Sequence, residues 1–495
     1  MRKLTLLFAL AVLLVAAIRS QTPSTPAPPP ELVTSKMTAS QADAALASAP
    51  FRQFSAFLEA FNSGDRTRLR QFQEANYPTM NLDTQMSRRE QSGGMVLRAL
   101  EQATPTRLTG IVFERDSYRF GMFAVEVDPA EPHRITRFAV LDIPRPADLP
   151  WPRMSEAETI AALRTKIEKD AAADRFAGTV LVAQLGKEPG RGPTKMLFNG
   201  TYGMADREKK VANTLDSQFR LGSMNKMFTA LSILQLVQTG KIKLTDPVGK
   251  YVTDYPNQDV ATKVTIHHLL THTGGTGDIF GPELTARRLE TRTHDDYVTL
   301  YGKRAPAFEP GTRWVYSNYG MVLLGVVIER VSGQSYYDYV AEHIYKPAGM
   351  TLSGSPLESE SVPGRATGYT RQGGGPWTTA TLGYRGSAAG GGLSTVGDLL
   401  KFSEALMGNR LLSPEYTELL ITGKVDTGGG GKYAYGFGDT RKDGVGYVGH
   451  NGGAPGMSGD LRIYLPSGYV VAVLSNLDPP AAPQVTTFID LRLPK

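Results

Sequence analysis

Hydrophobic residues recur at helical spacing in several stretches of the chain. From Met227 to Val237 they return every third or fourth position, and Gly240 stands where such a helix would end. The residues Ser155-x-x-Glu158 form a capping box, a pairing that typically opens a helix. The same spacing predicts further helices at 51–61, 95–100, 155–173 and 484–491.

Shorter apolar runs bounded by turn residues predict strands. Three of them lie early in the chain, at 108–114, 119–127 and 135–143. Six others lie at 179–185, 196–202, 433–440, 444–450, 459–465 and 469–474. The later group begins before a long helical middle and resumes after it, so we expect one antiparallel sheet in which the two ends of this part meet. The pattern therefore predicts an α+β fold.

The domain organisation follows from shifts in composition. Arg2-Lys3 and the apolar run from Leu4 to Ile18 predict a signal peptide at 1–20 and a periplasmic or secreted protein. If it stays uncleaved, this segment would anchor the protein in the membrane. A Pro-rich linker at 21–34 follows it. We expect a small α+β accessory domain at 35–150 and a larger domain at 151–495.

Composition and charge exclude several function classes. The formal charge of the 495 residues is +6, and Arg2, Lys3 and Arg19 of the leader account for three charges, which leaves 6 − 3 = +3. With no basic block, we expect no nucleic-acid partner. The chain has no cysteine, so disulfides and thiolate catalysis are excluded. His268 and His272 are four apart but lack the glutamate of a zinc motif, so we expect structural roles for them, and neither a metal nor another cofactor.

The clearest candidate for chemistry is Ser223-Met-Asn-Lys226, at the start of the apolar helix. Ser223 and Lys226 would lie one turn apart on the same face. The lysine amine could then take the proton of the serine hydroxyl, provided that burial lowers its pKa. A capping serine followed by a solvated lysine is the alternative, because this pairing often arises by chance.

Two further motifs support the catalytic interpretation. Tyr316-Ser-Asn318 lies in a predicted loop before a helix. A tyrosine beside an ammonium could lose its proton more easily and accept that of the serine, and Asn318 could orient Lys226 or a substrate carbonyl. His450-Asn-Gly452-Gly453 follows a predicted strand. There the Gly453 N–H and the Ser223 N–H could form a two-donor oxyanion hole, with His450 on the same wall.

Together, and in this order, the three motifs resemble those of the serine β-lactamase and penicillin-binding-protein-like superfamily. The resemblance covers about 176–476 and is strongest to the branch of class C β-lactamases, D-amino-acid peptidases and β-lactamase-like esterases. It implies a five-stranded antiparallel sheet with helices on both faces, next to an all-helical lobe. The segment 60–65, Ala-Phe-Asn-Ser-Gly-Asp, resembles the opening of small nuclear-transport-factor-2-like domains.

The resemblance implies metal-free acyl transfer. Ser223 would attack, Lys226 and Tyr316 would carry the proton, and Asn318, His450, Gly452 and Gly453 would bind the substrate or its oxyanion. A histidine is a weaker carboxylate anchor at pH 7 than the lysine of the family's K-T-G motif, so we expect a small ester, amide or peptide substrate without that carboxylate. The alternatives are a non-catalytic peptidoglycan- or peptide-binding protein, or a weak β-lactamase or DD-carboxypeptidase. The sequence does not predict the oligomeric state.

Overall fold

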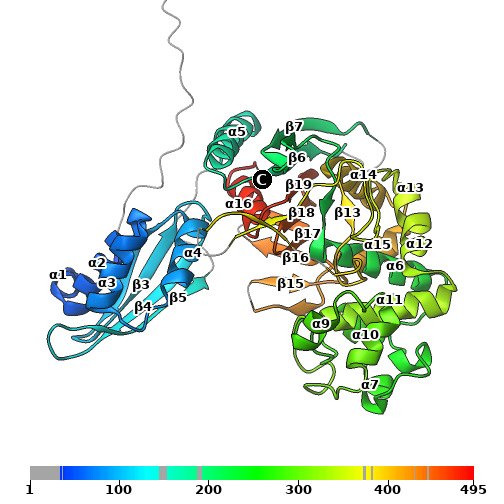
Figure 1. The fold of residues 1–495 in the computed structure, drawn as a ribbon, viewed down its shortest axis with the longest axis horizontal. Coiled ribbons are helices and arrows are strands. Elements are labelled where there is room, and N and C mark those ends of the chain that lie inside the picture. The colour runs from blue at the N-terminus through cyan, green and yellow to red at the C-terminus, as the bar shows by residue number, and fades with distance from the viewer. Residues whose placement is uncertain are drawn as a thin grey trace, which may run out of the picture.

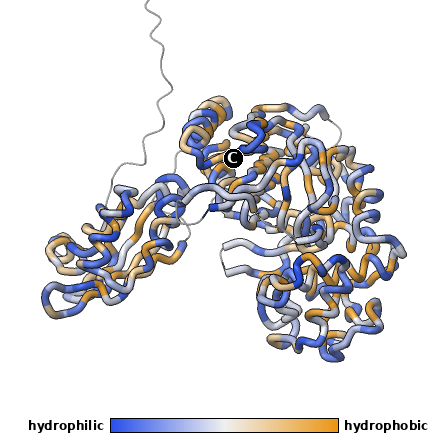
Figure 2. Tube along the Cα trace, viewed as in Figure 1, coloured by the Kyte–Doolittle hydropathy of each residue, from blue (hydrophilic) through white to orange (hydrophobic). Residues whose placement is uncertain are grey.

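The computed structural model describes residues 34–35, 37–143, 146, 153–186, 192–371, 375–380, 383–428, 430–442 and 445–494. Within them, two large sheets each carry their own helices (Figure 1). Figure 2 shows hydrophobic residues spread along the strands and helices of both parts. The predicted signal peptide and nearly all of the predicted linker lie outside the described residues. Among the residues that are described, no helix is long and apolar enough to cross a membrane.

The first sheet has five strands in the order β1-β2-β3-β4-β5, and all neighbours are antiparallel except β1 and β2. Its helices pack a shared core against the sheet, in which the rings of Phe54 and Phe123 stack at 3.9 Å between centroids. The strands are β1 (Thr34–Ser35), β2 (Met95–Ala103), β3 (Arg107–Glu114), β4 (Phe120–Val127) and β5 (Ile135–Ile143). The helices are α1 (Ala39–Ala47), α2 (Ala49–Ser63), α3 (Arg66–Asn76) and α4 (Leu82–Ser92).

The three early strands and the helix at 51–61 are confirmed, but the helix predicted at 95–100 is wrong. These residues form β2, directly after Gly93 and Gly94, whose φ angles of 68° and 101° end α4 and turn the chain. Two register shifts interrupt the pairing of β2 with β3. Buried residues of β2 therefore do not alternate strictly, and their irregular spacing resembles that of a helix.

Phe123→Ala is expected to destabilise this part of the protein by about 3–5 kcal/mol, because it empties the centre of the aromatic core. Phe123 is fully buried and stacked on Phe54. Its neighbour Met122 is 38% exposed, so Met122→Ala should change the free energy of unfolding by less than about 1 kcal/mol. Denaturant unfolding of the two variants checks this. Equal effects would show that the core is not built as described.

The second sheet has eight strands in the order β14-β15-β16-β17-β18-β19-β6-β7. As predicted, strands from both ends of this part meet, since β19 pairs antiparallel with β6. Its strands are β6 (Gly178–Gln184), β7 (Lys195–Tyr202), β14 (Val425–Asp426), β15 (Gly431–Tyr433), β16 (Gly438–Lys442), β17 (Val445–Ala454), β18 (Met457–Tyr464) and β19 (Tyr469–Ser475).

Two details of the sheet differ from expectation. The resemblance implied five strands, whereas β14, β15 and β16 extend one edge in the described residues. The strand predicted at 433–440 is in fact two strands, β15 and β16. Between them the chain turns at Ala434–Phe437, where the Ala434 N–H donates to the Phe437 carbonyl at 2.8 Å and Gly436 has a φ of 69°. Tyr433 therefore lies at the end of β15, beside the turn.

Helices cover both faces of this sheet (Figure 1). Along β6, Val180 and Val182 pack with α5 and α16, whereas Leu181 and Ala183 belong to the core shared with α6, α11 and α14. The helices are α5 (Glu156–Ala172), α6 (Lys226–Gln238), α7 (Gln258–Lys263), α8 (Ile266–Leu270), α9 (Pro282–Arg287), α10 (His294–Tyr301), α11 (Asn318–Ser332), α12 (Tyr336–Val340), α13 (Lys346–Ala348), α14 (Val396–Met407), α15 (Pro414–Ile421) and α16 (Ala481–Asp490). The Ser155 capping box and the last helix are confirmed.

The two parts touch through a small set of side chains. Tyr118, between β3 and β4, packs its ring on Phe488 of α16 at 5.4 Å between centroids. Arg371 forms an ion pair with Glu90 of α4. This contact lies where the hairpin of β11 (Tyr369–Thr370) and β12 (Thr378–Thr379) reaches towards α4 (Figure 1). The domain boundaries themselves stay a prediction.

Candidate active site

Ser223 lies on a tight turn that leads into α6. Residues Gly222–Asn225 form a 3-10 turn, η1, and the α-helix begins at Lys226. The prediction had placed Ser223 in the first turn of the α-helix itself. Gly222 has a φ of 54°, in the region that glycine tolerates, so the chain can turn sharply just before the serine. Ser223 and Lys226 are thereby brought to the same side of the turn.

Lys226 is fully buried, and its amine contacts three oxygens. The Nζ atom lies 3.0 Å from Ser223 Oγ and 2.8 Å from Asn318 Oδ1, and it also donates to the Ala389 carbonyl. The Asn318 amide is oriented by Asp278, because Nδ2 donates to both carboxylate oxygens, at 3.0 and 3.1 Å. Asn318 Oδ1 is therefore the atom that faces the lysine.

Burial lowers the pKa of Lys226 to about 7, although the nearby Asp278 carboxylate partly opposes this shift. The catalytic interpretation of the sequence required this lowered pKa. A neutral amine has two N–H groups and one lone pair. Because Asn318 Oδ1 and the Ala389 carbonyl can only accept, they take the two N–H groups. The lone pair then points at the Ser223 hydroxyl, which is the arrangement that a general base requires.

Tyr316 lies next to both Ser223 and Lys226. It forms a side-chain hydrogen bond with Ser223, and Lys226 Nζ lies 4.8 Å from the centre of its ring. Burial raises the pKa of Tyr316 above its usual value, and Asp278 raises it further. The expectation that the lysine would make this phenol more acidic is therefore wrong, since burial outweighs the effect of an amine that is only about half charged at neutral pH. Tyr316 is a protonated phenol, suited to donating a hydrogen bond.

Glycines allow the end of β17 to lie against the serine turn. A Cβ atom on Gly452 would lie 2.0 Å from the Leu221 carbonyl oxygen and 3.0 Å from the Ser223 nitrogen. One on Gly222 would lie 3.0 Å from the Gly453 nitrogen. No side chain fits between these backbones, so the motif requires glycine here. The close approach brings the backbone nitrogens of Ser223 and Gly453 near each other, where η1 meets the end of β17.

His450 also lies on β17, two residues before Gly452, but both of its ring nitrogens already have partners. Nδ1 donates to the Asn451 carbonyl at 2.5 Å, so Nε2 carries no proton and accepts from the Tyr433 hydroxyl at 3.0 Å. Burial, with a smaller contribution from Lys226, lowers the pKa of His450 to about 3. At neutral pH the position is therefore uncharged, as the sequence suggested, and its nitrogens are occupied.

His272 and Tyr433 lie at the site although neither was predicted there from the sequence. His272 lies beyond the end of α8 with a φ of 58°, so it does not share a helix with His268. Its ring lies 4.4 Å from Tyr316 and 4.6 Å from Tyr433 between centroids, and Nδ1 accepts from the Ser317 N–H. His268 caps the start of α8 at Thr265, a structural role as predicted. No local pattern marks Tyr433, which comes from a short edge strand.

Comparisons with known proteins cover the part of the chain that carries these motifs. The model of the Beta-lactamase family matches residues 174–493. The PbpX protein of Bacillus subtilis is 32% identical over 263 residues, which are 52% of this chain and 62% of PbpX. The chain thus spans less than two thirds of that relative.

Solved structures show the same similarity over nearly their whole length. A penicillin-binding protein from Bacillus halodurans is 32% identical with a TM-score of 0.60, covering 66% of this chain and 98% of that one. A D-stereospecific amidohydrolase from Streptomyces is 28% identical with a TM-score of 0.56, covering 66% of this chain and 97% of that one.

Proposed function

Because the chain belongs to the Beta-lactamase family, we propose that it is a serine hydrolase that forms an acyl-enzyme on Ser223. The observation that carries this proposal is the contact of Lys226 with Ser223 at 3.0 Å, with an amine whose pKa burial lowers to about 7. A solvated lysine beside a capping serine, the alternative from the sequence, would be exposed and charged. Lys226 is neither exposed nor fully charged at neutral pH.

In the first half of the reaction, the Lys226 lone pair takes the Ser223 proton as Oγ attacks the substrate carbonyl. The carbonyl oxygen becomes an oxyanion, which the Ser223 and Gly453 N–H groups would stabilise. Lys226 is now an ammonium held by Asn318 and Ala389. When the tetrahedral intermediate collapses, the leaving group departs with a proton supplied from Lys226, relayed through the Tyr316 hydroxyl.

In the second half, water hydrolyses the acyl-enzyme. Lys226, neutral again, and the adjacent Tyr316 are the groups that can take the proton of the water. The resemblance to the serine β-lactamase superfamily implied Tyr316 as this base. The raised pKa of Tyr316 and the lowered pKa of Lys226 favour the lysine as the proton acceptor and the tyrosine as a relay. Ser223 then recovers its proton as the acid product leaves.

For the substrate, we propose an ester or amide without a carboxylate on its leaving group, as in an esterase or a D-amino-acid peptidase. The support is His450, which begins an H-x-G motif where other members of the resembled family carry the lysine of K-T-G. It is uncharged, and its nitrogens are bound to Asn451 and Tyr433. Such a position cannot supply the cation that pairs with the carboxylate of a β-lactam or a D-alanyl peptide.

The test compares benzoyl-D-alanyl-lactate with its methyl ester, two depsipeptides that differ only in the leaving-group carboxylate. We expect kcat/KM to be at least about tenfold higher for the methyl ester, since one unpaired charge near a buried site costs at least about 1.4 kcal/mol. Ser223→Ala is the background control. A preference for the free carboxylate would instead favour a DD-carboxypeptidase or β-lactamase activity.

The remaining alternative is a non-catalytic protein that binds peptidoglycan or peptides on the same fold. Binding without turnover and without any Ser223 adduct would favour it. We further propose that residues 35–150 act as an accessory domain. Export rests on the basic and apolar leader, and contact with a membrane would require that this leader stays uncleaved.

A further inference from the structure

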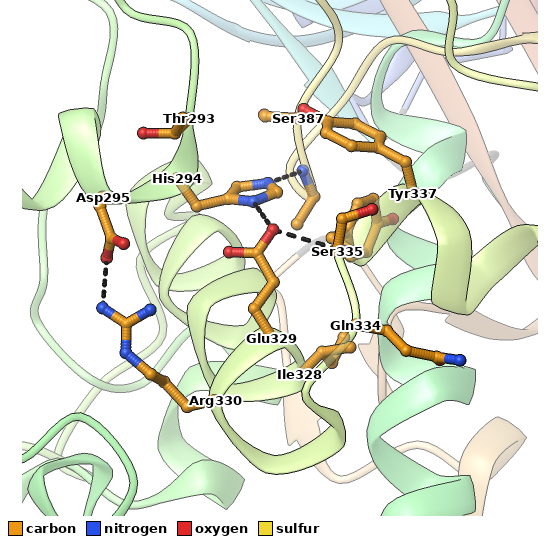
Figure 3. Close-up of polar contacts among 12 residues, drawn as sticks. Thr293, His294, Asp295, Ile328, Glu329, Arg330, Gln334, Ser335, Tyr337 and Ser387 are labelled. Carbon is orange, nitrogen blue, oxygen red and sulfur yellow. Dashed lines mark hydrogen bonds and ion pairs between the residues drawn. The ribbon is translucent and has the colours of Figure 1, made fainter.

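A second buried polar cluster joins α10 and α11 to the turn that contacts Lys226. Figure 3 shows His294, at the start of α10, pointing at Glu329 near the end of α11. Their Nδ1 and Oε1 atoms are 3.0 Å apart, and His294 is only 1% exposed. The other ring nitrogen, Nε2, accepts the backbone N–H of Ala388 at 3.0 Å. Neither residue touches Ser223, and none of the motifs includes them.

The partners fix the protonation of His294. Ala388 can only donate through its N–H, so Nε2 carries the lone pair. Nδ1 therefore carries the proton and donates to the Glu329 carboxylate, which also accepts the Tyr336 N–H at 3.1 Å. Gly325 of α11 lets the helix lie this close, since a Cβ there would be 3.0 Å from Nε2 of His294 and 2.7 Å from the Ala388 side chain. His294 is held as a directed acceptor for one backbone N–H.

That N–H belongs to the turn Ser387–Gly390, whose peptide groups are held from several sides. The Ser387 N–H donates to the Gly390 carbonyl at 2.7 Å. From α6 and the turn before it, the Thr229 hydroxyl donates to the Ala388 carbonyl at 2.7 Å, and Asn225 Nδ2 donates to the Ser387 carbonyl at 2.9 Å. The next carbonyl, that of Ala389, accepts from Lys226.

We propose that His294, oriented by Glu329, is a positioning residue for Lys226: it fixes the 387–390 turn so that the Ala389 carbonyl holds one amine N–H and leaves the lone pair aimed at Ser223. This inference rests on the proposed function and deepens it. Among the described residues, two acceptors, Asn318 Oδ1 and the Ala389 carbonyl, orient the neutral amine. If the carbonyl moves, the amine can rotate and the lone pair loses its direction.

His294→Phe keeps the ring but removes both the acceptor and the donor. We expect kcat/KM for an ester substrate to fall by about 10- to 100-fold with little change in KM, since misplacing one catalytic group has effects of this size. The ammonium form of Lys226 would also lose an acceptor, which should lower the pKa of Lys226 further. Activity rises with pH as Lys226 becomes neutral, so this acid limb of the pH–rate profile should move to lower pH by at least about half a unit.

His294→Gln is the conservative rescue, because its amide can accept from the Ala388 N–H and donate to Glu329. It should restore kcat/KM to within about threefold of the wild type. Thr229→Val removes the hydroxyl bonded to the Ala388 carbonyl without changing volume, and should shift the acid limb in the same direction. It tests the same turn should His294→Phe not fold.

The groups that face this cluster are few. Glu329, Tyr336 and Tyr337 face His294, and Arg385 lies over the Tyr337 ring. On the other side, Lys226 faces Tyr316, with Asp278 behind Asn318 and with two neutral imidazoles nearby, those of His272 and His450. Thr229→Val removes none of the titratable groups, and the two His294 variants remove only the imidazole itself, so a limb that shifts in the same direction in His294→Phe and in Thr229→Val reports the lysine.

Val471→Ala is the matched control, because Val471 is fully buried in the core on the opposite face of the sheet. It should lower stability without moving the pH profile. If His294→Phe only matches this control, the inference is wrong, while the proposed function stands. The Lys226 ¹³Cε chemical shift follows the titration of the amine without any turnover. An inactive wild type would therefore reject the proposed function but would still allow the role of His294 to be tested. An unchanged titration midpoint in His294→Phe would overturn that role.

Discussion

Ser223→Ala should lower hydrolysis of an activated ester such as p-nitrophenyl butyrate by at least about 10,000-fold in kcat/KM, because it removes the hydroxyl that is proposed to form the acyl-enzyme. The substitution removes a single hydroxyl from the turn before α6 and leaves the buried core unchanged. The thermal midpoint should therefore stay within a few degrees of that of the wild type. Steady-state kinetics and a thermal scan measure both quantities.

Ser232→Ala is the matched control, since Ser232 is a buried serine of α6 whose hydroxyl donates to the Phe228 carbonyl. This variant should keep nearly full activity. Residual turnover in Ser223→Ala above about a tenth of the wild-type rate would show that another group carries the reaction.

Lys226→Met should lower kcat/KM by about 1,000- to 10,000-fold, the upper range for loss of a general base. The thioether side chain is unbranched like that of lysine but has no lone pair basic enough to take the Ser223 proton. In the wild type, activity should rise with pH through about 7, where Lys226 becomes neutral, and this acid limb should be absent from the residual activity of the variant. Lys250→Met, at a side chain 53% exposed, should change neither.

The same variant tests the electrostatics without turnover. Because the pKa of Lys226 lies near 7 in the fold and near 10.5 in the unfolded chain, the unfolded chain binds an extra proton between these values. Wild-type stability should therefore rise from pH 7 to 10.5 relative to Lys226→Met, by an amount of the order of 4 kcal/mol. Below pH 7 the full penalty for burying the charge remains. A flat difference between the two proteins over this range would contradict a buried, neutral lysine.

Much of the fold follows from local signals. Ser155 and Glu158 cap α5, and Gly64 and Asp65 separate α2 from α3, because capping depends on residues only a few positions apart. The error at β2 has the opposite origin. The pairing of β2 with β3, including two register shifts, depends on residues of the other strand. The spacing of apolar residues within 95–100 therefore carries no information about this pairing.

The site shows the same division. Ser223 and Lys226 are neighbours on one turn, so their contact could be predicted, and the order of the motifs led to Tyr316 and Asn318. Three other contributions could not be predicted. The Ala389 carbonyl reaches Lys226 across 163 positions, and a carbonyl leaves no trace in the residue type. Asp278 orients Asn318 and acts on Lys226 through its charge, from a loop far away in the sequence, and the partners of His450 are set by where β15 ends.

The most direct test is to trap the covalent intermediate. The folded protein is treated with a fluorophosphonate near pH 8, where Lys226 is mostly neutral, then digested and mapped by mass spectrometry. One adduct per chain, on Ser223, lost in Ser223→Ala and formed far more slowly in Lys226→Met, is the predicted result. An adduct on another residue, or none on Ser223 in a protein that still hydrolyses esters, would contradict an active site built on this serine and lysine.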